Sequence, residues 1–131
     1  MKRFVTLFSL VVFCVLFCDT CTNYSLAPVY HKISAEEAYH MMQDTEEYIL
    51  LDVRTDEEFD KKHIEGAVLI PDIEIGSRAA TDLPDKNALI LIYCRSGRRS
   101  KNAANKLVAK GYTNVYDFGG INEWKHETVG D

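Results

Sequence analysis

The chain has 131 residues, of which 15 are basic and 20 acidic, so its formal net charge is −5 at pH 7. This length allows one domain and leaves no room for a second. An acidic chain is a poor match for the phosphate backbone of nucleic acids, which argues against a nucleic-acid-binding function.

The first residues have the pattern of an export signal. A positively charged start precedes an uncharged apolar run over residues 4–18, shorter than the roughly 20 residues that span a bilayer. We therefore expect residues 1–21 to direct export to the periplasm or another extracytoplasmic compartment. The cleavage position stays open. So does lipid modification of Cys18 or Cys21, as in bacterial lipoproteins, which would anchor the protein to a membrane.

Cysteine usage singles out one thiol. Removal of residues 1–21 leaves 13 basic and 19 acidic residues, a net charge of −6, and Cys94 as the one remaining cysteine. An exported domain with one thiol has no internal disulfide framework, so this thiol is available for chemistry or for a partner. Residues 22–29, which include Pro28, are expected to form a tether before a domain over residues 30–131.

Two kinds of pattern alternate along this domain. Short runs of β-branched and leucine residues predict buried strands, over residues 48–51, 67–70, 88–93 and 114–117. Capping residues and apolar periodicity predict helices, over residues 34–43, after Thr55, over 101–108 before Gly111, and around Trp124. Residues 72–84 mix helical and loop patterns. The alternation predicts an α/β fold, a small parallel sheet with helices on both faces.

Cys94 stands where the strand over residues 88–93 ends and a helix begins. In a parallel sheet this position lies at the carboxyl ends of the strands, where such sheets bind ligands. The first turn of the helix offers unpaired N–H groups, Gly97 allows a turn that points them inward, and three nearby arginines add positive charge. All of these favour a thiolate, so we predict a lowered pKa for Cys94. The alternative, a structural cysteine beside solvated arginines, explains the concentration of cations less well.

Several segments, taken in order, resemble the rhodanese superfamily of sulfurtransferases in its single-domain form. They are Leu51-Asp52-Val53-Arg54 with Glu57-Glu58-Phe59, His63-Ile64-Glu65-Gly66-Ala67 leading to Pro71, Cys94-x-x-Gly97-x-Arg99-Ser100, and Gly119-Gly120 with Trp124. The resemblance covers the chain from about Lys32 to Trp124. It implies that Cys94 takes the outer sulfur of a donor such as thiosulfate, becomes a persulfide, and passes the sulfur to a thiol or cyanide-like acceptor.

The resemblance also implies a substrate site around the catalytic Cys94. Inward N–H groups of the loop would stabilise the persulfide anion, and Arg98 or Arg99 would hold the anionic part of the donor. The predicted substrate-binding residues are Arg95, Ser96, Gly97, Arg98, Arg99 and Ser100. Arg54, the loop over residues 94–100 and the pair Gly119-Gly120 are expected to surround one shallow pocket.

Other residues of these segments are assigned supporting roles. Asp52 and Arg54 are expected to form a charge pair that fixes the neighbouring loops, with Glu65 as another candidate partner for Arg54. His63 is expected to stabilise a turn rather than act as a base, and Trp124 to be a core aromatic residue. The histidines lack metal-ligand spacing and one cysteine cannot build a zinc site, so we expect no metal and no other cofactor.

Two alternatives stay open at this point. Cysteine phosphatases and arsenate reductases have Cys-x5-Arg loops, whereas Arg99 follows Cys94 after four residues, and the tighter ring suits one sulfur better than a tetrahedral oxyanion. The second alternative is a sulfide-carrying or redox-sensing module that serves a partner protein and turns over thiosulfate slowly. The sequence argues against the first and does not separate the second from an enzyme.

Overall fold

The computed structural model describes residues 29–131, so the predicted export signal and nearly all of the predicted tether lie outside the described residues. The elements in chain order are β1 (His31–Lys32), α1 (Ala35–Asp44), β2 (Ile49–Asp52), α2 (Asp56–Lys61), β3 (Val68–Leu69), α3 (Ile75–Asp82), β4 (Ile90–Cys94), α4 (Arg98–Ala109), β5 (Val115–Gly120) and a 3₁₀ helix, η1 (Ile121–Glu123). None of the helices in this part of the chain is long and apolar enough to cross a membrane.

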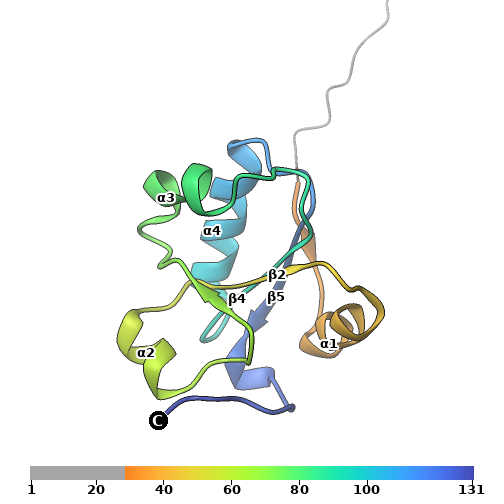
Figure 1. The fold of residues 1–131 in the computed structure, drawn as a ribbon, viewed down its shortest axis with the longest axis vertical. Helices are drawn as coiled ribbons and strands as arrows, with labels where there is room; N and C mark the ends of the chain where they lie inside the picture. The colour runs from red at the N-terminus through yellow and green to blue at the C-terminus, as the bar shows by residue number, and fades with distance from the viewer. Residues whose placement is uncertain (1–28) are drawn as a thin grey trace, which may run out of the picture.

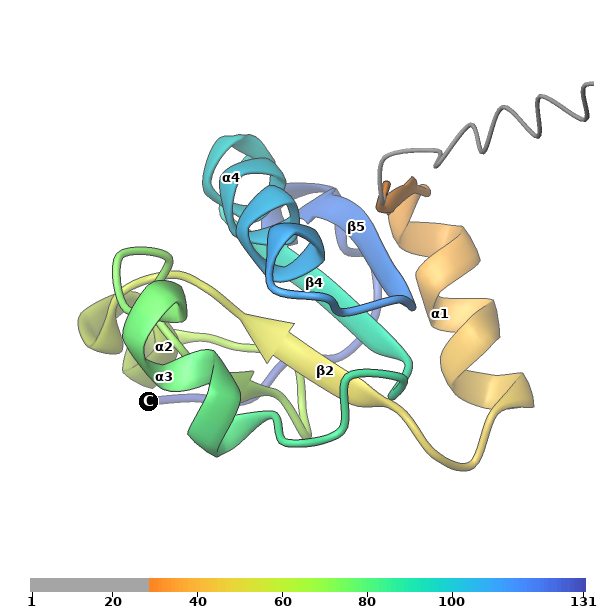
Figure 2. The same cartoon turned by 90° about the horizontal axis from the view of Figure 1, so that it is seen from above.

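The five strands form one sheet in the order β1-β5-β4-β2-β3, and every neighbouring pair is parallel. Helices α3 and α4 cover one face and α1 covers the other (Figure 1), and the view from above separates the two layers (Figure 2). The predicted α/β architecture, with a parallel sheet between helices, is confirmed.

The core has two halves, one on each face of the sheet. On the first face, α3 and α4 pack against alternate residues of β2 and β4, through Ala79, Ala104 and Leu107. On the second face, Ala38 of α1 packs with Phe118 and neighbouring apolar side chains. A sheet buried on both sides explains why β4 is apolar at every position rather than alternating.

Capping residues begin the first two helices. The Ser34 hydroxyl accepts from the N–H of Glu37, and the Glu37 carboxylate accepts from the N–H of Ser34. Thr55 and Glu58 repeat this arrangement at the start of α2. Each box satisfies two backbone donors that a helix start otherwise leaves unpaired. The helix predicted from Ser34 is therefore confirmed, with its last residue at Asp44.

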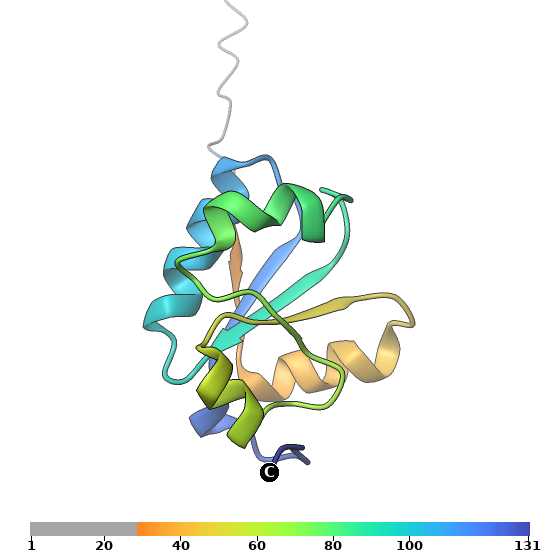
Figure 3. The same cartoon turned by 60° about the vertical axis from the view of Figure 1, so that its left-hand side comes forward.

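Several segments differ in the structure from what the sequence predicts. Residues 72–84 contain a regular helix, α3, because Ile75 and Ala79 lie one turn apart and are both fully buried. The Tyr112 hydroxyl donates to the carbonyl of Ala79 in α3 at 2.8 Å. Figure 3 shows α3 lying across the end of α4. Gly119 and Gly120 continue β5 instead of following it, and Trp124 comes directly after the 3₁₀ helix rather than within a helix.

Candidate active site

Cys94 is the last residue of the central strand β4, and α4 begins four residues later at Arg98. Between them the chain turns at Gly97, whose φ of +107° lies in the left-handed region that favours glycine. This turn points the Gly97 N–H back at the sulfur, so that it donates to Cys94 Sγ at 3.0 Å. We call residues 94–100 the Cys94 loop.

The Cys94 loop stabilises a thiolate. Burial alone would raise the pKa of Cys94, but hydrogen bonds from the Ser100 hydroxyl and from the N–H groups of Ser100, Gly97 and Ser96 outweigh it, and the pKa is lowered. Ser100 Oγ lies 3.6 Å from Sγ. The predicted direction is confirmed, although hydrogen bonds rather than the charges of the arginines are its main cause.

The glycine pair of β5 lies against this loop. Cys94 and Gly120 are register partners, and the Ser100 hydroxyl is within hydrogen-bonding distance of the Gly119 carbonyl, at 3.2 Å. A β-carbon on Gly120 would overlap the carbonyl of Arg95. The absence of a side chain on Gly120 is therefore what allows the loop to lie directly on the end of β5.

Asp52 and Arg54 form the predicted charge pair, and both are buried. Arg54 Nη2 donates to Asp52 Oδ2 at 2.7 Å and also to the carbonyl of Lys62 at 2.6 Å. The guanidinium carbon lies 5.6 Å from the centre of the Tyr93 ring. Glu65, the other candidate partner, is exposed and forms no hydrogen bond or ion pair with Arg54, whose further acceptor is the Lys62 carbonyl. The pair thus ties the end of α2 to the residue that precedes Cys94.

Arg99 is held by a partner that the sequence analysis did not assign. Its guanidinium donates to both carboxylate oxygens of Glu58, at 2.7 and 2.9 Å. This pairing is the main cause that lowers the pKa of Glu58 to about 2. Two of the five N–H donors of Arg99 are therefore used by Glu58 rather than free for a donor anion. Arg95 and Arg98 are exposed and have no acidic partner among residues 29–131.

The other residues of the matched segments have structural positions. His63 Nδ1 lies 2.8 Å from the Phe59 carbonyl, and its ring stacks on Phe59 with centroids 3.7 Å apart. The predicted turn-stabilising role of His63 is therefore confirmed. Trp124 is half-buried and packs against Phe118, at the edge of the core rather than inside it.

A surface hollow of about 320 Å³ opens beside the Cys94 loop. It lies between the end of α2, Arg95 of the Cys94 loop, and η1. Arg54, Lys62, Arg95 and Asn122 are among its lining residues, whereas Cys94 is not. The expected pocket shared by Arg54, the loop and the glycine pair is thus only partly present, because Gly119 and Gly120 pack against the loop and leave no space.

The fold and the site together define an α/β domain built around one activated thiol. The family model described as a rhodanese-like domain matches residues 34–127. The chain is 41% identical over 73 residues to the thiosulfate sulfurtransferase PspE of Escherichia coli, which covers 56% of this chain and 70% of that protein. It is 35% identical over 95 residues to a sulfurtransferase of Allochromatium vinosum, covering 72% and 87% of the two chains. The chain belongs to the rhodanese-like family.

Solved structures agree with this assignment. The structure described as rhodanese with anions from E. coli superposes with a TM-score of 0.60 and 37% identity, over 64% of this chain and 99% of that one. Some relatives are longer proteins, of which the chain covers 24% in one case and 50% in another. The chain covers most of the length of two relatives that are named as sulfurtransferases. These matches support sulfurtransferase activity for this domain.

Proposed function

We propose that the domain transfers sulfane sulfur in two steps through a persulfide on Cys94. In the first step the Cys94 thiolate attacks the outer sulfur of thiosulfate. A sulfur–sulfur bond forms at Cys94 while that of thiosulfate breaks, and sulfite leaves with the electron pair. In the second step an acceptor nucleophile such as cyanide or a thiolate attacks the outer sulfur of the persulfide, and the Cys94 thiolate is released.

The observation that carries this proposal is the hydrogen bond from the Gly97 N–H to Cys94 Sγ at 3.0 Å, within a loop that lowers the pKa of the thiol. A thiolate is the nucleophilic form of cysteine, so this geometry prepares the first step. The persulfide is also an anion, and the same N–H groups would stabilise its charge.

The anionic end of the donor is assigned to Arg95 and Arg98 rather than to Arg99. Both side chains are exposed at the Cys94 loop and lack acidic partners in the described part of the chain. A guanidinium group presents paired N–H donors that suit oxyanions such as the sulfonate end of thiosulfate. Arg99 serves this step indirectly, because its bonds to Glu58 hold the start of α4 in place.

Intact-mass spectrometry after incubation with thiosulfate tests the proposal. Wild-type protein should gain the mass of one sulfur atom, lose it on addition of cyanide, and form thiocyanate. Cys94→Ser should keep the far-ultraviolet circular dichroism of the wild type and gain nothing. Wild-type turnover by the serine variant, or hydrolysis of a phosphate ester by a wild-type protein that gains no sulfur, would overturn the mechanism.

The same experiment separates an enzyme from a sulfide carrier. An enzyme forms many equivalents of thiocyanate for each Cys94 when thiosulfate and cyanide are in excess. A carrier forms the persulfide but releases little more than one equivalent until its partner protein is added. We propose the enzyme, because the chain covers most of the length of relatives that are named as sulfurtransferases.

A further inference from the structure

The hollow beside the Cys94 loop is positively charged. Its acidic lining residue, Glu58, is neutralised by Arg99, and Lys61 is paired with Glu57 at 2.7 Å. Two lining cations, Lys62 and Arg95, have no acidic partner among residues 29–131. A local excess of positive charge therefore remains in a chain whose net charge is negative. We call this site the Lys62 hollow.

Buried contacts fix the walls of the Lys62 hollow. On the α2 side, buried Arg54 donates to the Lys62 carbonyl at 2.6 Å and so holds the backbone of Lys62 in place. On the opposite side, the Asn122 N–H donates to the Arg95 carbonyl at 3.3 Å, which joins η1 to the Cys94 loop. Figure 1 shows α2 and the 3₁₀ helix that follows β5 at the same end of the molecule. The hollow is therefore a preformed feature of the fold.

The size and lining of the hollow suit a small organic anion. About 320 Å³ is at the lower end of the range for small-ligand pockets. Two unpaired cations and the side-chain amide of Asn122 can together bind a carboxylate or sulfonate group. Arg95 lines the hollow and directly follows Cys94 in the chain, so the hollow adjoins the Cys94 loop.

We infer that the Lys62 hollow binds the acceptor of the second step, and that the preferred acceptor is a small thiol carrying a carboxylate or sulfonate. The inference rests on the proposed function, since it needs a persulfide on Cys94. The bound acceptor keeps its acidic group on Lys62 and Arg95 while its thiolate attacks the outer sulfur. The sulfur–sulfur bond at Cys94 breaks, the acceptor leaves as its own persulfide, and Cys94 returns to a thiolate.

Rates of persulfide discharge test the inference. The protein is loaded with thiosulfate, freed from excess donor, and mixed with 3-mercaptopropionate or with neutral 2-mercaptoethanol. For each variant the ratio of the two rates is compared with that of the wild type, so that the intrinsic reactivities of the thiols cancel. Lys62→Gln should lower the ratio about threefold to fivefold, as expected for loss of one exposed ion pair, and Lys62→Glu should lower it further. Added salt should lower the wild-type ratio.

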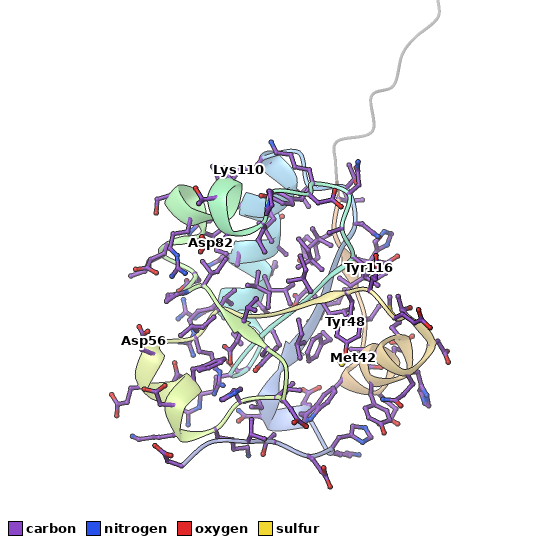
Figure 4. The ribbon with its side chains drawn as sticks, viewed as in Figure 1. Met42, Tyr48, Asp56, Asp82, Lys110 and Tyr116 are labelled. Carbon is purple, nitrogen blue, oxygen red and sulfur yellow. The ribbon has the colours of Figure 1, made fainter. Side chains whose placement is uncertain are left out.

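Lys110→Gln is the matched control. Lys110 is a lysine at the far end of α4, and Figure 4 places it at the end of the molecule opposite α2. Its substitution should leave the ratio unchanged. Loading by thiosulfate should be the same for the wild type and Lys110→Gln.

The outcomes separate this inference from the proposed function. If no persulfide forms in the wild type, the proposed function fails. If the persulfide forms but the ratio is the same in all variants, the acceptor site alone is wrong. Slower loading of Lys62→Gln with an unchanged discharge ratio would mean that Lys62 serves the donor rather than the acceptor, and it would also overturn the inference.

Discussion

Arg99 and Glu58 are 41 residues apart in the chain, and their side chains are joined by two hydrogen bonds of 2.7 and 2.9 Å. Glu58 also closes the capping box of α2, so one carboxylate fixes both the start of α2 and the start of α4. The Cys94 loop lies between this ion pair on one side and the glycine pair of β5 on the other. Its geometry therefore depends on residues that are far from Cys94 in the sequence.

The first prediction concerns this ion pair. Glu58→Gln should lower the free energy of unfolding at pH 7 by roughly 1.5–3 kcal/mol, the usual range for hydrogen bonds to charged groups. The pKa of Glu58 is lowered from 4.5 to about 2, so the stabilisation is fully present above pH 4.5 and is lost as the pH falls towards 2. Urea unfolding at several pH values should show wild type and variant converging in acid.

Glu57→Gln is the control for that experiment. Glu57 precedes Glu58 in the same helix, but its side chain and that of its partner, Lys61, are mostly exposed. Exposed pairs of this kind contribute little to stability, so this variant should unfold almost like the wild type. An equal loss of stability in both variants would contradict the role assigned to Arg99.

Local sequence was sufficient to predict the parts of the site that depend on neighbours in the chain. The position of Cys94 at a strand end, the turn at Gly97 and the lowered pKa all follow from the apolar run and the residues directly after it. The charge pair of Asp52 and Arg54 was also predicted, because the two residues are separated by only one position.

The parts that the sequence could not supply depend on packing between distant elements. The partner of Arg99 could not be found without knowing that α2 lies beside the start of α4, although an acid at the third position of α2 was visible. The predicted last strand ends at residue 117, before the two glycines, because glycine is poor in strands. They remain in β5 because Gly120 pairs with Cys94 of β4, where the Arg95 carbonyl occupies the space that a side chain on Gly120 would need.

The second prediction concerns ionisation of Cys94. Ser100→Ala removes a hydroxyl that stabilises the thiolate, so the pKa of Cys94 should rise towards its ordinary value. The rate of alkylation by iodoacetamide, measured against pH, should have its midpoint below the ordinary pKa of a cysteine in the wild type and at higher pH in the variant. Persulfide formation at pH 7 should slow several-fold for the same reason.

Ser77→Ala makes the same chemical change far from the sulfur. Ser77 is exposed on α3, and its hydroxyl donates to the carbonyl of Glu74. Its midpoint of alkylation should equal that of the wild type. If Ser100→Ala also leaves the midpoint unchanged, backbone N–H groups alone determine the pKa of Cys94.

The third prediction concerns the contact between Gly120 and the Cys94 loop. Gly120→Ala forces the Arg95 carbonyl away from β5, because a β-carbon would overlap it. The free energy of unfolding should fall by roughly 1–3 kcal/mol, as for overpacked sites, and persulfide formation should fall with it.

Gly76→Ala is the control, since nothing lies within 4 Å of the added carbon in α3. It should stabilise the helix by roughly 0.5–1 kcal/mol. Equal effects of the two substitutions would contradict this account of the glycine pair.

The last prediction concerns the start of the chain, which lies outside the described residues. We propose that residues 1–21 are an export signal, because a basic start precedes an uncharged apolar run. Protein recovered from the periplasmic fraction should lack at least residues 1–18 by N-terminal sequencing.

Val11→Arg, which places a charge in the apolar run, should hold the protein in the cytoplasm, whereas Val29→Arg should be exported normally. Recovery in the membrane fraction with an added acyl mass, lost in Cys18→Ser or Cys21→Ser, would identify a lipid anchor. A soluble cytoplasmic pool of wild-type protein that retains Met1 would contradict export.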